Sequence, residues 1–283
     1  MLASATSLAI ATTDRLVVYG DAEKHAVFAV PKAGGPPLRI GEGNPIAIAV
    51  TAHTIAWIAA PGDVLRRVSS RGGLEALADV TPLEEQGSTG PRRFTAIAAD
   101  GDDLVASEAS PAGSALMRVR KDDVTRIATF EGSAHALAVD ALGTYVATPS
   151  EVLLVPTGGS IGQLVTTGVE LAGLVVSSME IFTTSDAPGS GRALIHAPKS
   201  GGAAAPSMDR IRLAPIAVFR EHVYFLDRDH PVLRRIPLAG GDAAVVARAP
   251  ELSWGVALAV DESGVYVAAD HGRTPRVLAF ANP

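Results

Sequence analysis

Large apolar and small or polar residues alternate along short segments of this chain. Clear examples are Pro45–Val50 and residues 257–260, and turn-forming residues follow both segments. Alternation with a period of two is typical of half-buried β-strands, whereas an amphipathic helix has a period of 3.6 residues. No segment of ten residues shows the helical period. The pattern therefore predicts an all-β protein.

An element of the form apolar-aromatic-small recurs in seven copies of one repeat, and its central residue serves as a marker. The markers are Tyr19, Trp57, Ala106, Tyr145, Phe182, Tyr224 and Tyr266. They are spaced about 40 residues apart, so seven copies use the whole chain. Each copy has room for four short strands, separated by turns such as Asp-x-x-Gly at 140–143 and Gly-Gly at 240–241. This organisation predicts a seven-bladed β-propeller with four antiparallel strands per blade. A flat solenoid is the alternative, but it would need polar caps at both ends, which the sequence does not show.

The repeat also predicts the limits of the blades. We expect one domain over residues 1–283, with blades at 8–44, 45–90, 91–133, 134–168, 169–211, 212–250 and 251–283. The seventh copy ends after its third strand, at 276–280. We therefore expect residues 2–6 to pair antiparallel with 276–280, completing the last blade and closing the ring.

Two motifs resemble a known repeat family. Residues 235–241 read Arg-Ile-Pro-Leu-Ala-Gly-Gly, and residues 259–266 read Ala-Val-Asp-Glu-Ser-Gly-Val-Tyr. Both are similar to the YWTD/NHL-like propeller repeats of bacterial surface and periplasmic proteins. The resemblance covers all seven copies, most weakly the third and fifth, although no copy contains the Tyr-Trp-Thr-Asp tetrapeptide. It implies a propeller with a binding role in the periplasm or at the cell surface, and it transfers no catalytic residue. If Met1 is the native start, we expect a cytoplasmic protein instead.

Composition excludes several classes of function. The chain has 283 residues, 47% of them apolar and 19% charged, with a net charge of −6. This charge gives no basic surface for nucleic acid. With no cysteine, disulfides, thiolate zinc sites and cysteine nucleophiles are excluded. The longest uncharged stretch, 152–169, is broken by Pro156 and several glycines, so we expect no membrane insertion. We expect a monomer.

The loop lengths favour one end of the blades for function. If strands A to D run from the channel to the rim, the A–B and C–D turns share one end, and the B–C and D–A loops share the other. The A–B and C–D turns are short and uniform, whereas the B–C and D–A loops vary in length and chemistry. Variable loops on a rigid scaffold usually carry binding residues. We therefore expect the site at the B–C/D–A end.

Two groups of candidate residues lie at that end. The first occupies B–C loops of blades 6, 7 and 1, which are neighbours in a closed ring: Asp21, His25, Asp227, Asp229, His230, Asp270 and His271. Imidazole and carboxylate together suit Zn, Mn or Fe, although separate solvated loops would explain the same residues. The B–C loops of blades 3 and 5 add Glu108 and Asp186. The second group is predicted to ring the channel mouth: Asn44, Arg92, Arg93, His135, Glu170, Arg212 and Trp254. Such a ring would hold an anionic or sugar-like ligand, with Trp254 as a stacking plane, or its charges would satisfy one another across water.

No catalytic motif in the sequence indicates a class of enzyme. The chain has no Gly-x-Ser-x-Gly elbow, no His-Glu-x-x-His and no phosphate-binding loop. We therefore predict a non-enzymatic binding or scaffold propeller without a cofactor, which engages a protein or a glycan through the B–C/D–A end. The alternative is a hydrolase or lyase that depends on a divalent metal, with its site at the channel mouth or in the loops of blades 6, 7 and 1. This enzymatic alternative stays open because some seven-bladed propeller enzymes have no catalytic motif in their linear sequence.

Overall fold

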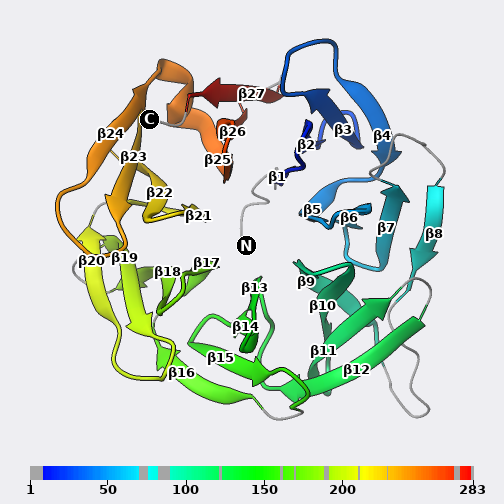
Figure 1. Ribbon diagram of the computed structural model, residues 1–283. Coiled ribbons are helices and arrows are strands. Elements are labelled where there is room, and N and C mark those ends of the chain that lie inside the picture. The colour runs from blue at the N-terminus through cyan, green and yellow to red at the C-terminus, as the bar shows by residue number, and fades with distance from the viewer. Residues whose placement is uncertain are drawn as a thin grey trace. The chain divides into compact units, whose positions relative to one another are not determined.

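Seven antiparallel sheets make up the computed structural model, which describes residues 9–69, 76–81, 90–120, 123–159, 162–168, 170–187, 191–209, 211–227, 229–270 and 275–281 (Figure 1). Strands follow chain order within each sheet, so each sheet is a simple meander. Six sheets have four strands, and the seventh has three among the described residues. This organisation confirms the seven-bladed β-propeller fold that the repeat predicts.

The strands have the following limits. The first three sheets contain β1 (Ile10–Thr12), β2 (Leu16–Asp21), β3 (Ala26–Pro31) and β4 (Leu38–Glu42); β5 (Pro45–Val50), β6 (Thr54–Ala59), β7 (Val64–Ser69) and β8 (Ala76–Val80); and β9 (Arg93–Asp100), β10 (Asp103–Ser110), β11 (Gly113–Arg120) and β12 (Asp123–Phe130). The fourth and fifth sheets contain β13 (Ala136–Asp140), β14 (Gly143–Ala147), β15 (Glu151–Pro156) and β16 (Gln163–Thr167); and β17 (Ala172–Val176), β18 (Glu180–Ala187), β19 (Gly191–Pro198) and β20 (Ala205–Asp209). The last two contain β21 (Ile211–Phe219), β22 (His222–Asp227), β23 (Val232–Pro237) and β24 (Ala244–Arg248); and β25 (Gly255–Asp261), β26 (Gly264–Asp270) and β27 (Pro275–Phe280).

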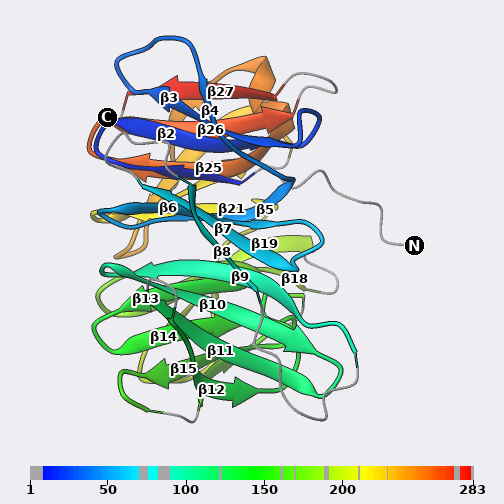
Figure 2. The same cartoon turned by 90° about the vertical axis from the view of Figure 1, so that its right-hand side faces the viewer.

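The chain divides into two compact units. The first comprises Met1–Val146 with Val155–Gln163, and the second comprises Ala147–Leu154 with Leu164–Pro283. Within the first unit, consecutive sheets adjoin through their first strands, because β5 contacts both β1 and β9, and β9 contacts β13. Figure 2 shows β9 to β12 of this unit as adjacent strands. Within the second unit, β21 contacts β17 and β25 in the same way.

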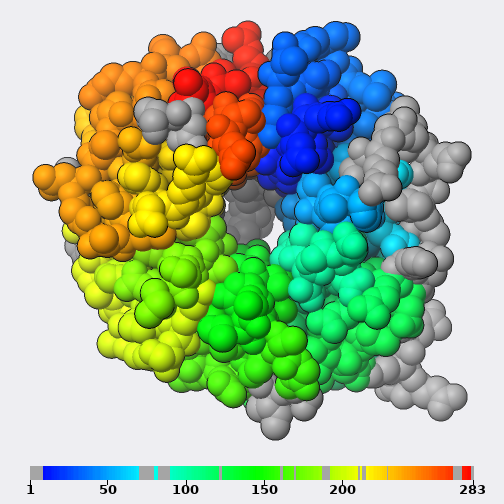
Figure 3. All heavy atoms as spheres, viewed as in Figure 1, coloured from blue at the N-terminus to red at the C-terminus, as the bar shows by residue number. Residues whose placement is uncertain are grey.

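Aromatic marker residues fill the space between neighbouring sheets. Trp57 on β6 is 2% exposed and packs with Val18 and Val27 of the first sheet. Its Nε1–H donates a hydrogen bond of 3.1 Å to the carbonyl oxygen of Glu42. A Cβ at Gly41 would lie 2.2 Å from the Trp57 ring, so only glycine permits this approach. Figure 3 shows the first two sheets, in two shades of blue, packed side by side. At Trp57 the repeat marker is therefore a core position, whereas the marker Tyr19 is half-buried.

The Asp-x-x-Gly motifs form the predicted A–B turns. Asp140 ends β13 and Gly143 begins β14, and the Asp140 carboxylate accepts a hydrogen bond of 2.8 Å from the backbone N–H of Leu142. Asp261 accepts a bond of the same length from the backbone N–H of Ser263. These side chains replace backbone partners within the turn.

Some predicted limits differ from the observed ones. The first strand of blade 6, expected from residue 212, begins one residue earlier, at Ile211. The ring-closing strand predicted at 2–6 lies outside the described residues. Pro250–Trp254 forms a short 3₁₀-helix, η1, before β25. Within the described residues, no helix has the length and apolar character needed to span a membrane.

Candidate functional site

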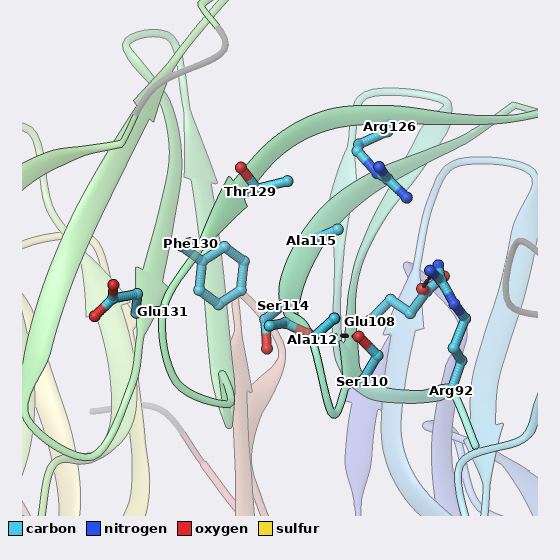
Figure 4. Close-up of a pocket in the computed structure, with 11 residues that line it drawn as sticks. Arg92, Glu108, Ser110, Ala112, Ser114, Ala115, Arg126, Thr129, Phe130 and Glu131 are labelled. Atoms are coloured by element: carbon cyan, nitrogen blue, oxygen red, sulfur yellow. Dashed lines mark hydrogen bonds and ion pairs between the residues drawn. The ribbon is translucent and has the colours of Figure 1, made fainter. Parts of the chain in front are cut away.

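A cavity of about 390 Å³ lies at the B–C/D–A end of the third sheet (Figure 4). In this sheet, strands A to D are β9 to β12. The cavity walls come from the segment before β9, the β10–β11 hairpin and the end of β12. The lining residues are Arg92, Glu108, Ser110, Ala112, Gly113, Ser114, Ala115, Arg126, Thr129, Phe130 and Glu131. The cavity lies at the end of the blade where sequence analysis expects binding.

A buried ion pair forms one wall of this cavity. Arg92 Nη1 lies 2.5 Å from Glu108 Oε1, and the two side chains are 11% and 2% exposed. Burial removes both charges from water, so their mutual attraction and hydrogen bonding must offset a desolvation cost of several kcal/mol per ion. Removing either partner would take this ion pair away from a charge that stays buried. The pair is therefore a rigid, polar feature of the cavity.

The ion pair lies beside an irregularity in the sheet. Glu108 was expected in a B–C loop, but this expectation is wrong, because β10 continues to Ser110. The β9–β10 register shifts between Ser107 and Glu108. Such a bulge redirects side chains locally. The sequence predicts Arg92 at the channel mouth but does not reveal its pairing with Glu108, because a register shift between strands has no linear signal.

Hydroxyl groups and one aromatic ring complete the cavity. Ser110 Oγ donates a hydrogen bond of 2.9 Å to the carbonyl oxygen of Gly113, across the hairpin. Ser114 is buried at the start of β11, Thr129 is exposed on β12, and Phe130 is half-buried. Figure 4 shows the Phe130 ring on one side of the hairpin and the Arg92–Glu108 pair on the other. The cavity thus offers hydrogen-bond donors, acceptors and an apolar face.

A second cavity of about 310 Å³ lies at the opposite end of the third sheet. Arg118 Nη2 and Asp100 Oδ2 form an ion pair of 3.0 Å in its wall, and Thr157 and Asp140 border it. Burial, and then the nearby carboxylate of Asp140, raise the pKa of Tyr145 to about 12. The short, uniform turns at this end make it a useful control region for experiments on the first cavity.

Two of the carboxylates predicted to bind a metal, those of Asp21 and Asp227, instead stabilise the turns that follow β2 and β22. Asp21 is 1% exposed; its Oδ1 accepts a bond of 3.0 Å from the Lys24 backbone N–H, and its Oδ2 lies 2.9 Å from Lys24 Nζ. Asp227 Oδ1 accepts bonds of 3.0 and 3.1 Å from the backbone N–H groups of Asp229 and His230. Asp227 Oδ2 accepts a bond of 2.8 Å from Arg234 Nε. Burial alone would raise the pKa of Asp227, but the hydrogen bonds from Arg234 and the turn outweigh it, and the pKa is lowered.

These positions correct the loop assignment of the metal candidates. Asp21, Asp227 and Asp270 are the last residues of β2, β22 and β26, not loop residues, and Asp186 lies within β18. The remaining candidates follow these strands: His25 is exposed with φ 48°, Asp229 is exposed, and His230 Nδ1 lies 3.3 Å from Asp227 Oδ1. His271 lies outside the described residues. Among the described residues, no three or more acidic or histidine side chains are grouped to hold a metal ion. The metal site stays a prediction.

The seven channel-mouth candidates divide between the two units. The first unit holds Asn44, Arg92, Arg93 and His135, and the second holds Glu170, Arg212 and Trp254. Arg93 and His135 are exposed, and Glu170 is exposed with φ 47°. Trp254 ends η1 and is 50% exposed. The buried Oδ1 of Asn44 has no hydrogen-bond partner within the part of the chain that the structure describes. Arg212 lies on β21. A shared ligand site for all seven residues stays a prediction.

Comparisons with known proteins show the fold. No family model and no curated protein matches the chain. A streptogramin B lyase structure is similar over 100% of this chain and 96% of its own, with a TM-score of 0.72 and 10% identity. BamB from Moraxella catarrhalis is similar over 92% of this chain and 81% of its own, with a TM-score of 0.58 and 12% identity. The PQQ-bound aldose sugar dehydrogenase from Streptomyces coelicolor is similar over 85% of this chain and 95% of its own, with a TM-score of 0.58 and 13% identity. At these identities the likeness extends to the fold alone, and function must be argued from the site.

Proposed function

We propose that this protein is a non-enzymatic binding protein that engages a glycan or a protein through the B–C/D–A end of its blades. One observation carries the proposal: the cavity of about 390 Å³ at that end of the third sheet. Its size lies within the range of about 300–1,000 Å³ that is typical of ligand pockets. The neighbouring hairpin and the segment before β9 supply its polar groups.

The chemistry of the cavity favours binding over catalysis. Glu108 is held by Arg92 at hydrogen-bond distance, and both side chains are nearly buried. A general acid or base must come within hydrogen-bond distance of its substrate, whereas the Glu108 carboxylate is buried and already hydrogen-bonded to Arg92. The pair is better suited to orient hydrogen bonds toward a ligand. We propose a role in the periplasm or at the cell surface, as a monomer, which is the setting implied by the resemblance to YWTD/NHL-like repeats.

The proposal is tested with two variants: one blocks the first cavity, and the other places a bulky side chain at the opposite end of the third sheet. The purified protein is screened against a glycan array and a peptide library, and any ligand found is titrated into two variants. Ala112→Trp places a bulky side chain on the exposed hairpin of the cavity, and Thr157→Trp does the same on an exposed turn beside the second cavity. We expect Ala112→Trp to weaken binding more than tenfold and Thr157→Trp to leave it unchanged, with the ligand recovered intact.

Two results would overturn the proposal. One is binding that survives Ala112→Trp but is lost in Thr157→Trp, because the site would then lie at the opposite end. The other is consumption of the ligand. If consumption required a divalent metal, the result would support the hydrolase or lyase alternative.

A further inference from the structure

The outermost strand of the third sheet is longer than its counterparts in the other four-stranded sheets. β12 has eight residues, whereas β4, β8, β16, β20 and β24 have five each. Among the described residues, no strand pairs with the outer side of β12, which Figure 1 shows at the edge of its sheet. An edge strand presents unpaired backbone N–H and C=O groups, and proteins often keep such strands short. The length of β12 therefore suits pairing with a further extended segment.

One face of β12 belongs to the same side of the sheet as Glu108. Thr129 pairs with Ala115, and Ala115 pairs with Glu108. Arg126 pairs with Met117, which lies two residues beyond Ala115 on β11. Residues paired across strands share a face, and so do residues two apart on one strand. Arg126 and Thr129 therefore lie on the face of Glu108.

The charges on this face favour an acidic partner. Glu108 is held by Arg92, and their side chains are nearly buried, whereas Arg126 is exposed on the outermost strand. Figure 4 shows Arg126 and the Arg92–Glu108 pair on the same side of the β10–β11 hairpin. Among the described residues that line the first cavity on this face, two arginines face one glutamate, which leaves an excess of positive charge. Opposite charges on neighbouring strands attract, so a carboxylate is favoured beside Arg126.

An extended peptide matches both the edge and the charge. Its backbone supplies the N–H and C=O partners that an edge strand lacks, and cavities beside the edge select its alternate side chains. Since side chains in a strand alternate between the two faces, acidic residues at every second position would all lie on the face of Arg126. A saccharide chain offers no comparable row of amide groups.

We propose that an extended, acidic segment of a protein partner adds to the edge of β12 as a fifth strand, with its carboxylates facing Arg126 and the first cavity. This inference rests on the proposed binding function, and it identifies the partner as a protein segment rather than a glycan.

The test uses labelled peptides and the full-length protein, with binding followed by fluorescence anisotropy. One eight-residue peptide alternates Glu with Val, and a second has Lys in place of each Glu. We expect the acidic peptide alone to bind. Arg126→Glu should weaken its binding about tenfold, because repulsion replaces attraction. The matched control, Arg248→Glu, changes an exposed arginine on the five-residue outer strand β24 and should leave binding unchanged.

N-methylation of the acidic peptide tests strand pairing itself. In an antiparallel ladder, alternate residues direct their N–H groups to opposite edges of the strand. Methylating every Glu amide therefore blocks one edge, and methylating every Val amide blocks the other. Because β12 pairs with one edge only, we expect one of these peptides to lose binding and the other to keep it.

Several outcomes would overturn the inference while leaving the proposed function intact. Equal binding of the acidic and basic peptides, or binding that tolerates methylation of both edges, would exclude addition of an acidic strand. Binding weakened by Arg248→Glu but not by Arg126→Glu would place the peptide on another sheet. Silence with every peptide would also overturn the inference, and binding of methyl glucuronide that Ala112→Trp displaces would then show a glycan ligand. If neither peptides nor the saccharide depend on Ala112, the proposed function itself fails.

Discussion

Asp21 and Asp227 stabilise the turns that follow β2 and β22, because each carboxylate accepts a hydrogen bond from backbone N–H groups two or three residues later. The sequence shows acidic residues beside histidines, a combination that also suits a metal. It does not show that the carboxylates fold back onto their own turns, because this depends on backbone geometry. For this reason the residue types alone leave a metal site open as an alternative, although the local hydrogen bonds do not require one.

Acid should destabilise the protein through two aspartates. The hydrogen bond from Arg120 is the main cause of the lowered pKa of Asp103, and the pKa of Asp227 is lowered by its bonds to Arg234 and the turn, despite burial. A carboxylate with a lower pKa in the folded state stabilises the fold above its unfolded pKa of about 3.9. This contribution is lost as the pH falls through the folded pKa. Urea denaturation should show a free energy of unfolding that declines below about pH 4.

Asp227→Asn is the matched variant for this prediction. It keeps the size of the side chain but removes the charge that Arg234 contacts. Its free energy of unfolding should be lower than that of the parent at neutral pH and should fall less steeply in acid. If the two proteins show the same acid dependence, Asp227 is not one of the responsible groups.

Alkaline conditions should destabilise the protein through Tyr145. Its pKa is raised to about 12, first by burial and then by Asp140, against an ordinary value of 10.0. The neutral phenol is therefore favoured in the folded state, and stability is lost as the pH rises from about 10 toward 12. Ultraviolet absorbance should show this tyrosine ionising late, together with unfolding. Tyr145→Phe should remove the late component, and an unchanged titration curve would contradict the assignment.

At the scale of the strand and turn, replacing Gly143 by alanine should lower the free energy of unfolding far more than replacing Gly158 by alanine. Gly143 has φ 151°, and an added Cβ would lie 2.1 Å from the carbonyl oxygen of Val155. Gly158 has φ 75°, but an added Cβ would meet nothing within 4 Å. We expect Gly143→Ala to cost more than about 3 kcal/mol of unfolding free energy and Gly158→Ala about 1 kcal/mol. Thermal denaturation compares the two variants, and equal losses would show that backbone conformation alone explains both glycines.

Strands and A–B turns could be predicted because their signals are local. The Asp-x-x-Gly sequence at 140–143 and 261–264 contains the turn chemistry itself. The cavity could not be predicted, because its lining comes from three separate segments and lies beside the register shift between Ser107 and Glu108. A bulge arises from cross-strand register, which an amino-acid pattern does not encode at one position. The sequence therefore predicted a site at the end of the blade where this cavity lies, but not the ion pair within the cavity, and the site itself stays a prediction.

At the scale of the whole molecule, residues 1–7 should be essential to stability. The repeat predicts that residues 2–6 supply the fourth strand of the seventh sheet, and β27 is an edge strand among the described residues. An added strand would contribute about four ladder hydrogen bonds of about 1 kcal/mol each, plus burial of Leu2. Deleting residues 1–7 should therefore lower the melting temperature sharply or cause aggregation. A deletion variant that melts like the parent would exclude this role for the N-terminus.

The most direct test of the binding account is hydrogen exchange, measured by mass spectrometry with and without the glycan or peptide ligand found by screening. Binding in the first cavity should slow exchange in peptides that cover the β10–β11 hairpin and the end of β12, because both line the cavity. Exchange in the turn at 156–159, beside the second cavity, should not change. Protection confined to that turn, or to peptides of the second unit, would contradict the account.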